Sequence, residues 1–300
     1  MEGLYINSSS QDQSYDYSNT TSNYQNNNKL DEYRDKLYFI RDVVVYIIIA
    51  VGLPLTLVAI YALYSMVRRD HVAPIYLINL LITDILQFCC MIIRVALNVD
   101  WMRYFIHRIY LSALIASVYF MVCISLERYL VIAHPLWYRF RRTIKTSVVL
   151  CVLVWVLSAV CAVCFYFTDV TYILFAILFL PPFPLLIFSL VGTLKALSAT
   201  ISVPSDEKRR IVGILVLVLL IYTLLFLPSI ILLLEINNDK TWFLENYKLR
   251  LNLLSTIFLS LSPLADLFLY VFMRKGFIDK LLASVCCCRM DSNDISCPSV

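Results

Sequence analysis

Residues Ile211–Leu234 read IVGILVLVLLIYTLLFLPSIILLL, a stretch without a single charged side chain. A helix needs about 20 consecutive apolar residues to cross the hydrocarbon core of a bilayer. Inside a bilayer every backbone N–H and C=O must be satisfied internally, which a helix achieves on its own. The stretch therefore predicts a transmembrane helix, with a kink near Pro228 because proline has no backbone N–H.

Six further stretches have the same character, and the whole chain is 61% hydrophobic and 15% charged, with a mean hydropathy of +0.78. Soluble domains carry about a quarter of charged residues, so the composition itself indicates a membrane protein. The sequence predicts an all-α fold, a seven-transmembrane helix bundle over residues 37–273. The other spans are Val43–Val67, His71–Ile93, Ile109–Leu126, Thr146–Phe167, Val170–Leu194 and Leu251–Met273.

The charges of the loops predict an orientation. With the N-terminus outside, the inner loops and tail hold an excess of Lys and Arg, whereas the outer segments hold slightly more acids than bases. The positive-inside rule thus favours an outside N-terminus and a cytoplasmic C-terminus. The net charge of +4 is too small and too scattered to favour a nucleic-acid partner. The inner basic residues include Arg68, Arg69, Arg139, Arg141, Arg142, Lys208, Arg209, Arg210, Arg274 and Lys275.

Both tails carry modification signals. Residues 1–36 form a polar stretch, expected to be a disordered extracellular tail, with N-glycosylation triplets at Asn7 and Asn19. No signal peptide is apparent, so the first span would act as an uncleaved anchor. Residues 274–288 predict a short amphipathic inner helix ending in a cluster that suits palmitoylation, or that forms reduced surface thiols, before a cytoplasmic tail at 289–300. The cluster is Cys286, Cys287 and Cys288.

Two acids lie inside predicted spans, where ionisable groups are costly and mark functional sites. Asp84 is in the second span, and Asp266 is in the seventh, four residues after Ser262 and on the same helix face. Two carboxylates with a hydroxyl suit a small hard cation. The alternative is a hydrogen-bonded pair of carboxyl groups that shares a proton without any ion. Both interpretations remain open.

Glu127-Arg128-Tyr129 ends the third span at the cytoplasmic surface. An acid beside an arginine there can form a charge pair that breaks when a partner arrives. Prolines inside spans free carbonyl groups and kink helices, so they mark candidate hinges or packing features. These prolines are Pro54, Pro182, Pro184 and Pro228.

Together these features resemble the rhodopsin-like (class A) G-protein-coupled receptors from Leu37 to Cys288. The residues that carry the resemblance stand in family order: Asn79, Leu80 and Asp84, then Ser117, Glu127, Arg128, Tyr129, His134 and Pro135, then Trp155, Pro182, Phe226, Leu227, Pro228, Asp266 and Tyr270.

The resemblance implies roles for these residues. Asp84, Ser117, Ser262 and Asp266 would form a sodium site, with sodium as the one candidate cofactor. Arg128 would contact the G protein once its bond to Glu127 opens. Phe226 would be the aromatic switch beneath the ligand, Pro228 the pivot of the sixth span, and Tyr222 and Tyr270 would relay the movement. The chain departs from the family pattern at Thr56, Phe226, Leu267 and Glu127, which leaves basal activity and coupling open.

The usual outer disulfide of the family is not expected here. Arg103 stands where the third span normally has its cysteine, and the ten cysteines all fall in spans or on the inner side. The loop before the fifth span is also very short. These features, with the run from Pro135 to Arg142, look similar to the MAS-related receptors. They predict an open ligand pocket.

The outer ends of the second, third and seventh spans are basic and aromatic. Such an entrance favours an anionic ligand, for example a lipid acid, a lysophospholipid, a nucleotide or an acidic peptide. Alternatively, these side chains reach lipid headgroups or pair with nearby acids. The candidate ligand residues are Arg94, Arg103, His107, Arg108, Tyr110, Lys248 and Arg250.

The sequence therefore predicts a multi-pass plasma-membrane receptor that binds an extracellular ligand and activates a heterotrimeric G protein, with arrestin and membrane lipids as further candidate partners. A seven-span transporter or channel could also use Asp84 and Asp266. A decoy that binds ligand without signalling is a third possibility. No nucleophile–base set, metal-ligand cluster or phosphate loop stands out in the sequence, so an enzyme is not expected.

Overall fold

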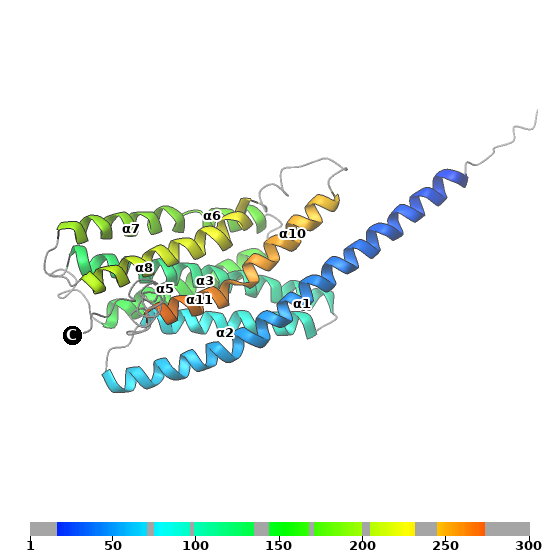
Figure 1. Ribbon diagram of the computed structural model, residues 1–300. Coiled ribbons are helices and arrows are strands. Elements are labelled where there is room, and N and C mark those ends of the chain that lie inside the picture. Colours follow the sequence, from blue (N-terminus) through cyan, green and yellow to red (C-terminus); the bar gives the residue numbers. More distant parts are fainter. Residues whose placement is uncertain are drawn as a thin grey trace, which may run out of the picture.

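The computed structural model describes residues 17–70, 75–96, 99–134, 144–167, 171–199, 205–231 and 245–273. They form a bundle of long helices, and the N-terminal helix projects well beyond the others (Figure 1). Among the described residues, seven segments are long and apolar enough to cross a membrane, which confirms the predicted all-α bundle. These are Glu32–Ser65, Ile75–Ala96, Trp101–Ala133, Lys145–Phe167, Ile173–Ser198, Lys208–Ile231 and Leu249–Phe272.

The helices follow the predicted spans, with two spans divided by a break. The first three are α1 (Tyr17–Asp70), α2 (Ile75–Ala96) and α3 (Asp100–Ala133), and the fourth span is α5 (Ile144–Phe167). The fifth span consists of α6 (Thr171–Phe179) and α7 (Pro182–Ala199). The sixth is α8 (Ser205–Ile221) continued by the π-helix η1 (Tyr222–Phe226), and the seventh is α10 (Glu245–Ser260) followed by α11 (Ser262–Met273).

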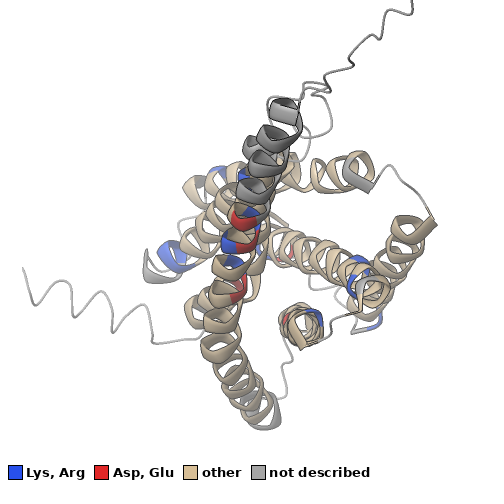
Figure 2. Ribbon diagram, turned by 90° about the vertical axis from the view of Figure 1, so that its right-hand side faces the viewer, with Lys and Arg blue, Asp and Glu red and all other residues tan. Residues whose placement is uncertain are grey.

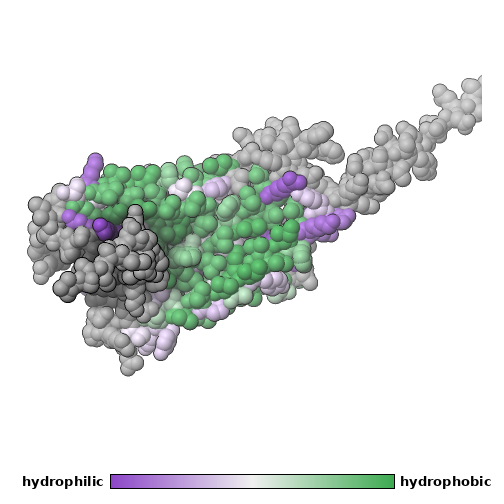
Figure 3. Space-filling model, in the orientation of Figure 1, coloured by the Kyte–Doolittle hydropathy of each residue, from purple (hydrophilic) through white to green (hydrophobic). Residues whose placement is uncertain are grey.

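The outer surface of the bundle is apolar along its middle and hydrophilic towards its two ends (Figure 3). Large apolar side chains point outwards there, among them Val58, Ile177, Leu224 and Phe268. In water such a surface would be unfavourable, but lipid tails are its natural surroundings. Figure 2 views the bundle roughly along its helices, with charged residues coloured. Most of the described residues in this view are uncharged. The distribution fits a protein that spans a bilayer.

Helix α3 lies at the centre and packs against α2, α5, α7 and α8. Most of its apolar side chains are buried, including Leu114, Phe120 and Met121. A polar link joins two neighbours of α3, because the Trp155 indole on α5 donates a 2.9 Å hydrogen bond to the Asn79 side chain on α2. A buried hydrogen bond between spans fixes their register, which apolar packing alone does weakly.

The N-terminal tail differs from expectation. Residues 1–36 were expected to be disordered, yet α1 begins at Tyr17 and continues to Asp70 through Pro54. Residues 17–36 contain no glycine or proline, and extending a helix that a long apolar segment has already nucleated costs little per residue. At the outer end α1 is joined to α10, because the Arg250 side chain donates to the Tyr33 hydroxyl and lies 5.3 Å from the Tyr33 ring centre.

The break in the fifth span follows from three prolines. Pro181, Pro182 and Pro184 have no N–H, so the carbonyls four residues earlier lose their helical partners. Tyrosine hydroxyls from two other helices bind carbonyls of this stretch. Tyr119 donates at 3.2 Å to the Leu178 carbonyl, four residues before Pro182. Tyr222 donates to the Phe179 carbonyl, because the Phe183 N–H bonds to the Leu180 carbonyl instead. The break is therefore held by α3 and η1.

The sixth and seventh spans are irregular near prolines as well. Pro228 follows η1, in which the Leu227 N–H bonds to the Tyr222 carbonyl, five residues back. The seventh span turns at Leu261, two residues before Pro263. The family proline expected after Asp266 is replaced by Leu267, but Pro263 interrupts the same helix slightly earlier. π-Helical turns and such breaks occur often at functional positions.

Candidate functional site

Asp84 on α2 and Asp266 on α11 both lie in the interior of the bundle and are fully buried. Their carboxyl groups are near enough for the charge of Asp266 to act on Asp84. The Ser117 hydroxyl of α3 donates a 2.9 Å hydrogen bond to Asp266 Oδ2. Three helices that the sequence separates widely therefore bring these three side chains together, as the resemblance implied.

Several oxygens of this cluster lack a hydrogen-bond donor. Neither carboxyl oxygen of Asp84, nor Oδ1 of Asp266, nor Oγ of the fully buried Ser262 receives a hydrogen bond from another group. Unsatisfied oxygens in an apolar interior are costly, so such a set calls for a proton, a water or a cation. Among the described residues, no three or more His, Cys, Asp and Glu side chains lie together in a group that could hold a metal ion. Two carboxylates with two hydroxyls suit a monovalent hard cation such as sodium.

Gln87, one turn beyond Asp84 on α2, is a residue that sequence reasoning missed. It is fully buried, and neither its oxygen nor its nitrogen has a hydrogen-bond partner. The signal was its spacing, because residues three apart on a helix share a face. The polar cluster thus extends from the two acids towards the outer side of the bundle.

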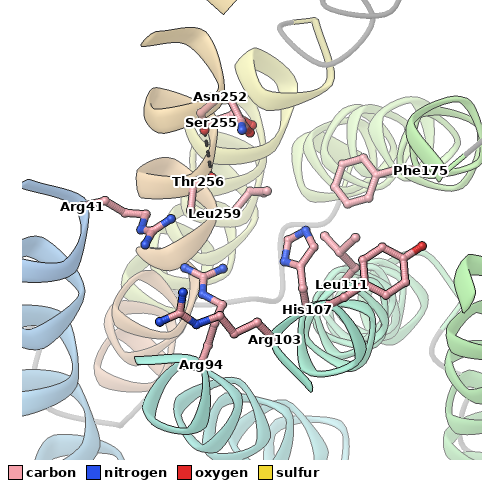
Figure 4. A pocket seen from close by; sticks show the side chains of 11 residues that line it. Arg41, Arg94, Arg103, His107, Leu111, Phe175, Asn252, Ser255, Thr256 and Leu259 are labelled. Atoms are coloured by element: carbon pink, nitrogen blue, oxygen red, sulfur yellow. Dashed lines mark hydrogen bonds between the residues drawn. The ribbon is translucent and has the colours of Figure 1, made fainter. Parts of the chain in front are cut away.

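A second site is a cavity of about 310 Å³ at the end of the bundle that the sequence predicts to be the outer one. Arg41, Arg94 and Arg103 come from α1, α2 and α3, and their guanidinium groups point into the same part of the cavity, with His107 facing them from α3 (Figure 4). No acidic residue belongs to its lining among the residues that the structure describes. The remaining lining residues are Tyr104, Leu111, Phe175, Asn252, Ser255, Thr256 and Leu259.

The structure brings together only some of the predicted ligand residues. Arg94, Arg103 and His107 line the cavity, whereas Arg108 bonds to the Tyr104 hydroxyl and lies 4.2 Å from its ring centre. Tyr110 is buried and its ring stacks with that of His107 at 6.4 Å, so it supports a lining residue.

Two predicted ligand residues of the seventh span remain apart from the cavity lining. Arg250 is taken up by Tyr33, and the side chain of Lys248 is outside the described part of the structure.

Arg41 was missed because it stands in the first span, which was treated as a membrane anchor. Its only sequence signal was a cation two residues before the apolar run. Its guanidinium also pairs with Asp42 at 2.8 Å and lies 4.9 Å from the Tyr38 ring centre. Asn252, Ser255 and Thr256 were missed for another reason: polar residues in a mixed helix give no sign of which face they occupy.

A stack of aromatic rings connects this cavity with the sixth span. Phe175 lines the cavity and stacks on Phe179 at 4.1 Å between ring centres. Phe179 stacks on Phe226 at 5.4 Å, and Phe226 on Tyr222 at 5.7 Å, with interplanar angles of 20°, 28° and 26° along the series. Phe179, Phe226 and Tyr222 are fully or almost fully buried. Close packing of aromatic rings therefore connects Phe175 with η1, just before Pro228.

At the predicted cytoplasmic end, Glu127, Arg128 and Tyr129 lie in the last turns of α3. The Tyr129 ring packs edge-on against Phe188 of α7, with 5.3 Å between ring centres, and against His134. Gly192 of α7 leaves room for this ring. Tyr270 is half-buried on α11 and packs against the core. The contact of Tyr129 with Phe188 and Gly192 thus joins α3 to α7 at this end of the bundle.

Some predicted features cannot be located in this way. Asn7, the run Pro135–Arg142, the inner amphipathic helix and Cys286, Cys287 and Cys288 lie outside the described residues, as does the side chain of Asn19. None of the six cysteines within the described spans belongs to a disulfide. No disulfide therefore joins cysteines of that part of the chain.

Seven membrane-spanning helices, two buried acids on α2 and α11 and an acid–arginine pair ending α3 define a seven-transmembrane receptor. Residues 55–173 match the family described as "7 transmembrane receptor (rhodopsin family)". Over this part of its length the chain is similar to the rhodopsin-like (class A) family of G-protein-coupled receptors. This is a family of receptors and not of enzymes.

Individual relatives are distant. Mouse (Mus musculus) G-protein coupled receptor 68 is 27% identical, over 64% of this chain and 61% of its own length. A chicken (Gallus gallus) purinoceptor is 24% identical over 80% and 78%, and rat (Rattus norvegicus) free fatty acid receptor 3 is 30% identical over 45% and 46%. The match thus spans about three fifths of the length of the G-protein coupled receptor 68 proteins. The similarity to MAS-related receptors stays a prediction.

Proposed function

We propose that this chain is a plasma-membrane receptor that binds an anionic extracellular ligand in the arginine-lined cavity and activates a heterotrimeric G protein. The observation that carries the proposal is the ring stack from Phe175 to Tyr222, which gives the cavity a packed connection to the sixth span. Arg94, Arg103 and His107 supply the positive charge that attracts an anion. The name of the rat relative, free fatty acid receptor 3, also concerns a carboxylate ligand.

The mechanism follows the packing. A ligand whose acidic group binds the guanidinium groups presses on Phe175, and the stack shifts Phe226. The sixth span then pivots at Pro228 and moves away from α7. Asp266 shifts with this movement, because α11 packs against α8. Asp84, Ser117, Ser262 and Asp266 would hold a sodium ion before the shift and would bind it less well afterwards. Arg128 finally parts from Glu127 and contacts the G protein.

The remaining topology belongs to the same proposal. The N-terminus lies outside with glycans on Asn7 and Asn19, and the C-terminus is cytoplasmic with palmitate on Cys286, Cys287 and Cys288. Membrane lipids surround the apolar belt, and arrestin is a further partner for the inner face. Each modification is tested by the mass of the expressed protein before and after glycosidase or hydroxylamine treatment.

The test of the proposal compares wild-type chain with three variants at equal surface expression. Arg128→Ala should abolish G-protein activation, and Arg94→Gln should lower the response to an anionic ligand at least tenfold. Phe175→Ala should retain ligand binding but lose most of the response, because the stack is shortened. An Arg128→Ala variant that signals undiminished would overturn the mechanism. Binding without signal in the wild type would identify a decoy, and ion flux would identify a transporter.

A further inference from the structure

Three guanidinium groups converge in the outer cavity from three different helices. Arg41, Arg94 and Arg103 point into one region (Figure 4), near enough for Arg94 to sense the charges of the other two. Like charges repel, and in a partly buried site that repulsion is strong. Asp42 pairs with Arg41 from outside the lining. An anion between the three guanidinium groups would offset their repulsion.

Two other side chains of the cavity each have a polar atom without a hydrogen-bond partner among the described residues. Ser255 is almost fully buried and its Oγ has no partner, and the buried Nδ1 of His107 has none either. Both residues belong to the cavity lining, on α10 and α3. Buried polar atoms without partners are rare, so each indicates a ligand atom that completes it. The recognition set thus comprises three guanidinium groups, a hydroxyl and an imidazole.

We infer that this set selects a phosphate monoester over a carboxylate, an inference that rests on the proposed function. A phosphate monoester carries a charge of about −1.5 to −2 at pH 7 and three strong acceptor oxygens. A carboxylate carries one charge and two oxygens. Arginine clusters recognise phosphate groups through paired N–H bonds. Three guanidinium groups that approach from three directions can bind the three oxygens of a phosphate, whereas a carboxylate offers them only two.

The rest of the cavity indicates what the phosphate is attached to. Leu111, Phe175 and Leu259 form an apolar wall away from the arginines. A volume of about 310 Å³ is at the lower end of the range of ligand sites, which is about 300–1,000 Å³. The ligand is therefore a compact phosphate monoester with an apolar portion. It can come from a phosphorylated lipid or from a small phosphorylated metabolite.

The inference is tested on the full chain in nanodiscs at pH 7.4, by equilibrium binding of three probes. Dodecyl phosphate and dodecanoate share a tail and differ in the acidic group, and sn-glycerol 3-phosphate has no tail. Dodecyl phosphate should bind at least tenfold more tightly than dodecanoate. Arg41→Gln should reduce this preference to less than threefold. Lys36→Gln, which removes an exposed charge paired with Glu32, is the matched control and should leave the preference unchanged.

The outcomes separate the inference from the proposed function. Equal affinity for dodecyl phosphate and dodecanoate, with both weakened at least tenfold by Arg94→Gln, overturns the phosphate preference and leaves the anion site intact. No binding of any probe overturns both. Where phosphate is preferred, tight binding of sn-glycerol 3-phosphate identifies a soluble metabolite as the source, and binding of dodecyl phosphate alone identifies a lipid. A preference retained in Arg41→Gln contradicts the assignment to three guanidinium groups.

Discussion

Tyr222 of the sixth span donates its phenolic hydrogen to the main-chain carbonyl of Phe179 in the fifth. The acceptor is a carbonyl in the stretch where Pro181, Pro182 and Pro184 disrupt the helical hydrogen bonds. The same tyrosine opens η1 and stacks on Phe226. The Tyr222 hydroxyl therefore supplies a hydrogen bond to a carbonyl of the interrupted fifth span. It also connects that span to the sixth, which is proposed to move.

Tyr222→Phe should loosen this connection. The variant leaves the Phe179 carbonyl without its donor in a buried place, which costs about 1–3 kcal/mol. We expect a lower thermal unfolding temperature together with higher basal G-protein activation, since the sixth span is released from the fifth. Tyr61→Phe removes a hydroxyl from a tyrosine that is 75% exposed on α1 and serves as the control. Unchanged stability and unchanged basal signal would show that the bond contributes nothing.

Gly52→Ala should destabilise the bundle, and Gly213→Ala should not. A Cβ at position 52 would lie 2.5 Å from the ring of Phe88, which is fully buried and has no space to retreat. Overpacking of this kind costs about 1–3 kcal/mol. At position 213 nothing lies within 4 Å of the added atom, and alanine stabilises a helix interior by about 0.5–1 kcal/mol over glycine. The thermal unfolding temperatures of the two variants, measured in the same detergent, give both effects. A fall in unfolding temperature for Gly213→Ala as large as that for Gly52→Ala would refute the packing argument.

The seven spans could be predicted from the sequence because a membrane helix is recognisable from length and composition alone. Asp84 and Asp266 could be predicted as well, since an acid in an apolar run has few explanations. Which face a helix turns inwards was harder to predict. Arg41 precedes an apolar run without a polar side, and Ser255 lies in a mixed helix, so neither could be assigned to the cavity. Arg250 was assigned to it although Tyr33 holds it outside.

The breaks in the spans were only partly predictable. Prolines indicated where the fifth span would bend, but the tyrosines that fill its free carbonyls come from residues far away in the sequence. Their pairing depends on how helices rotate against each other. The length of α1 was missed because the polar composition of residues 17–36 favours disorder locally, whereas the attached apolar helix favours its continuation.

Trp155→Phe should weaken the contact between α5 and α2. The indole N–H bonds to Asn79 at 2.9 Å, and the Trp155 ring packs against Phe120 with 5.9 Å between ring centres. Phenylalanine keeps most of the ring contact but loses the hydrogen bond. Hydrogen bonds between membrane helices contribute about 0.6 kcal/mol on average, up to about 1.7. We expect a loss in this range in unfolding measurements.

A double-mutant cycle with Asn79→Leu isolates this bond. Trp155→Phe should cost less in the Asn79→Leu background than in the wild type, because the bond is already absent there. Equal costs in the two backgrounds would attribute the effect of the tryptophan to packing alone.

The buried acids should make stability depend on sodium. Binding to the folded state at ten times the dissociation constant stabilises it by about 1.4 kcal/mol. We expect the wild type to unfold at a higher temperature in sodium chloride than in choline chloride at the same ionic strength. Asp84→Asn should remove that difference, while Asp35→Asn, at an exposed position on α1, should retain it. A wild type indifferent to the cation would favour the carboxyl pair that shares a proton.

The outer cavity has its charges on one wall and Phe175 on another. Under the proposed function, affinity and efficacy would be set by different parts of a ligand. The acidic group would determine how tightly a compound is held, and the bulk facing Phe175 would determine how far the ring stack is displaced. Compounds that share an acidic group but shrink at the apolar end would compete equally well and activate progressively less. Within one chemical series the receptor would thus pass from full agonists through partial agonists to antagonists.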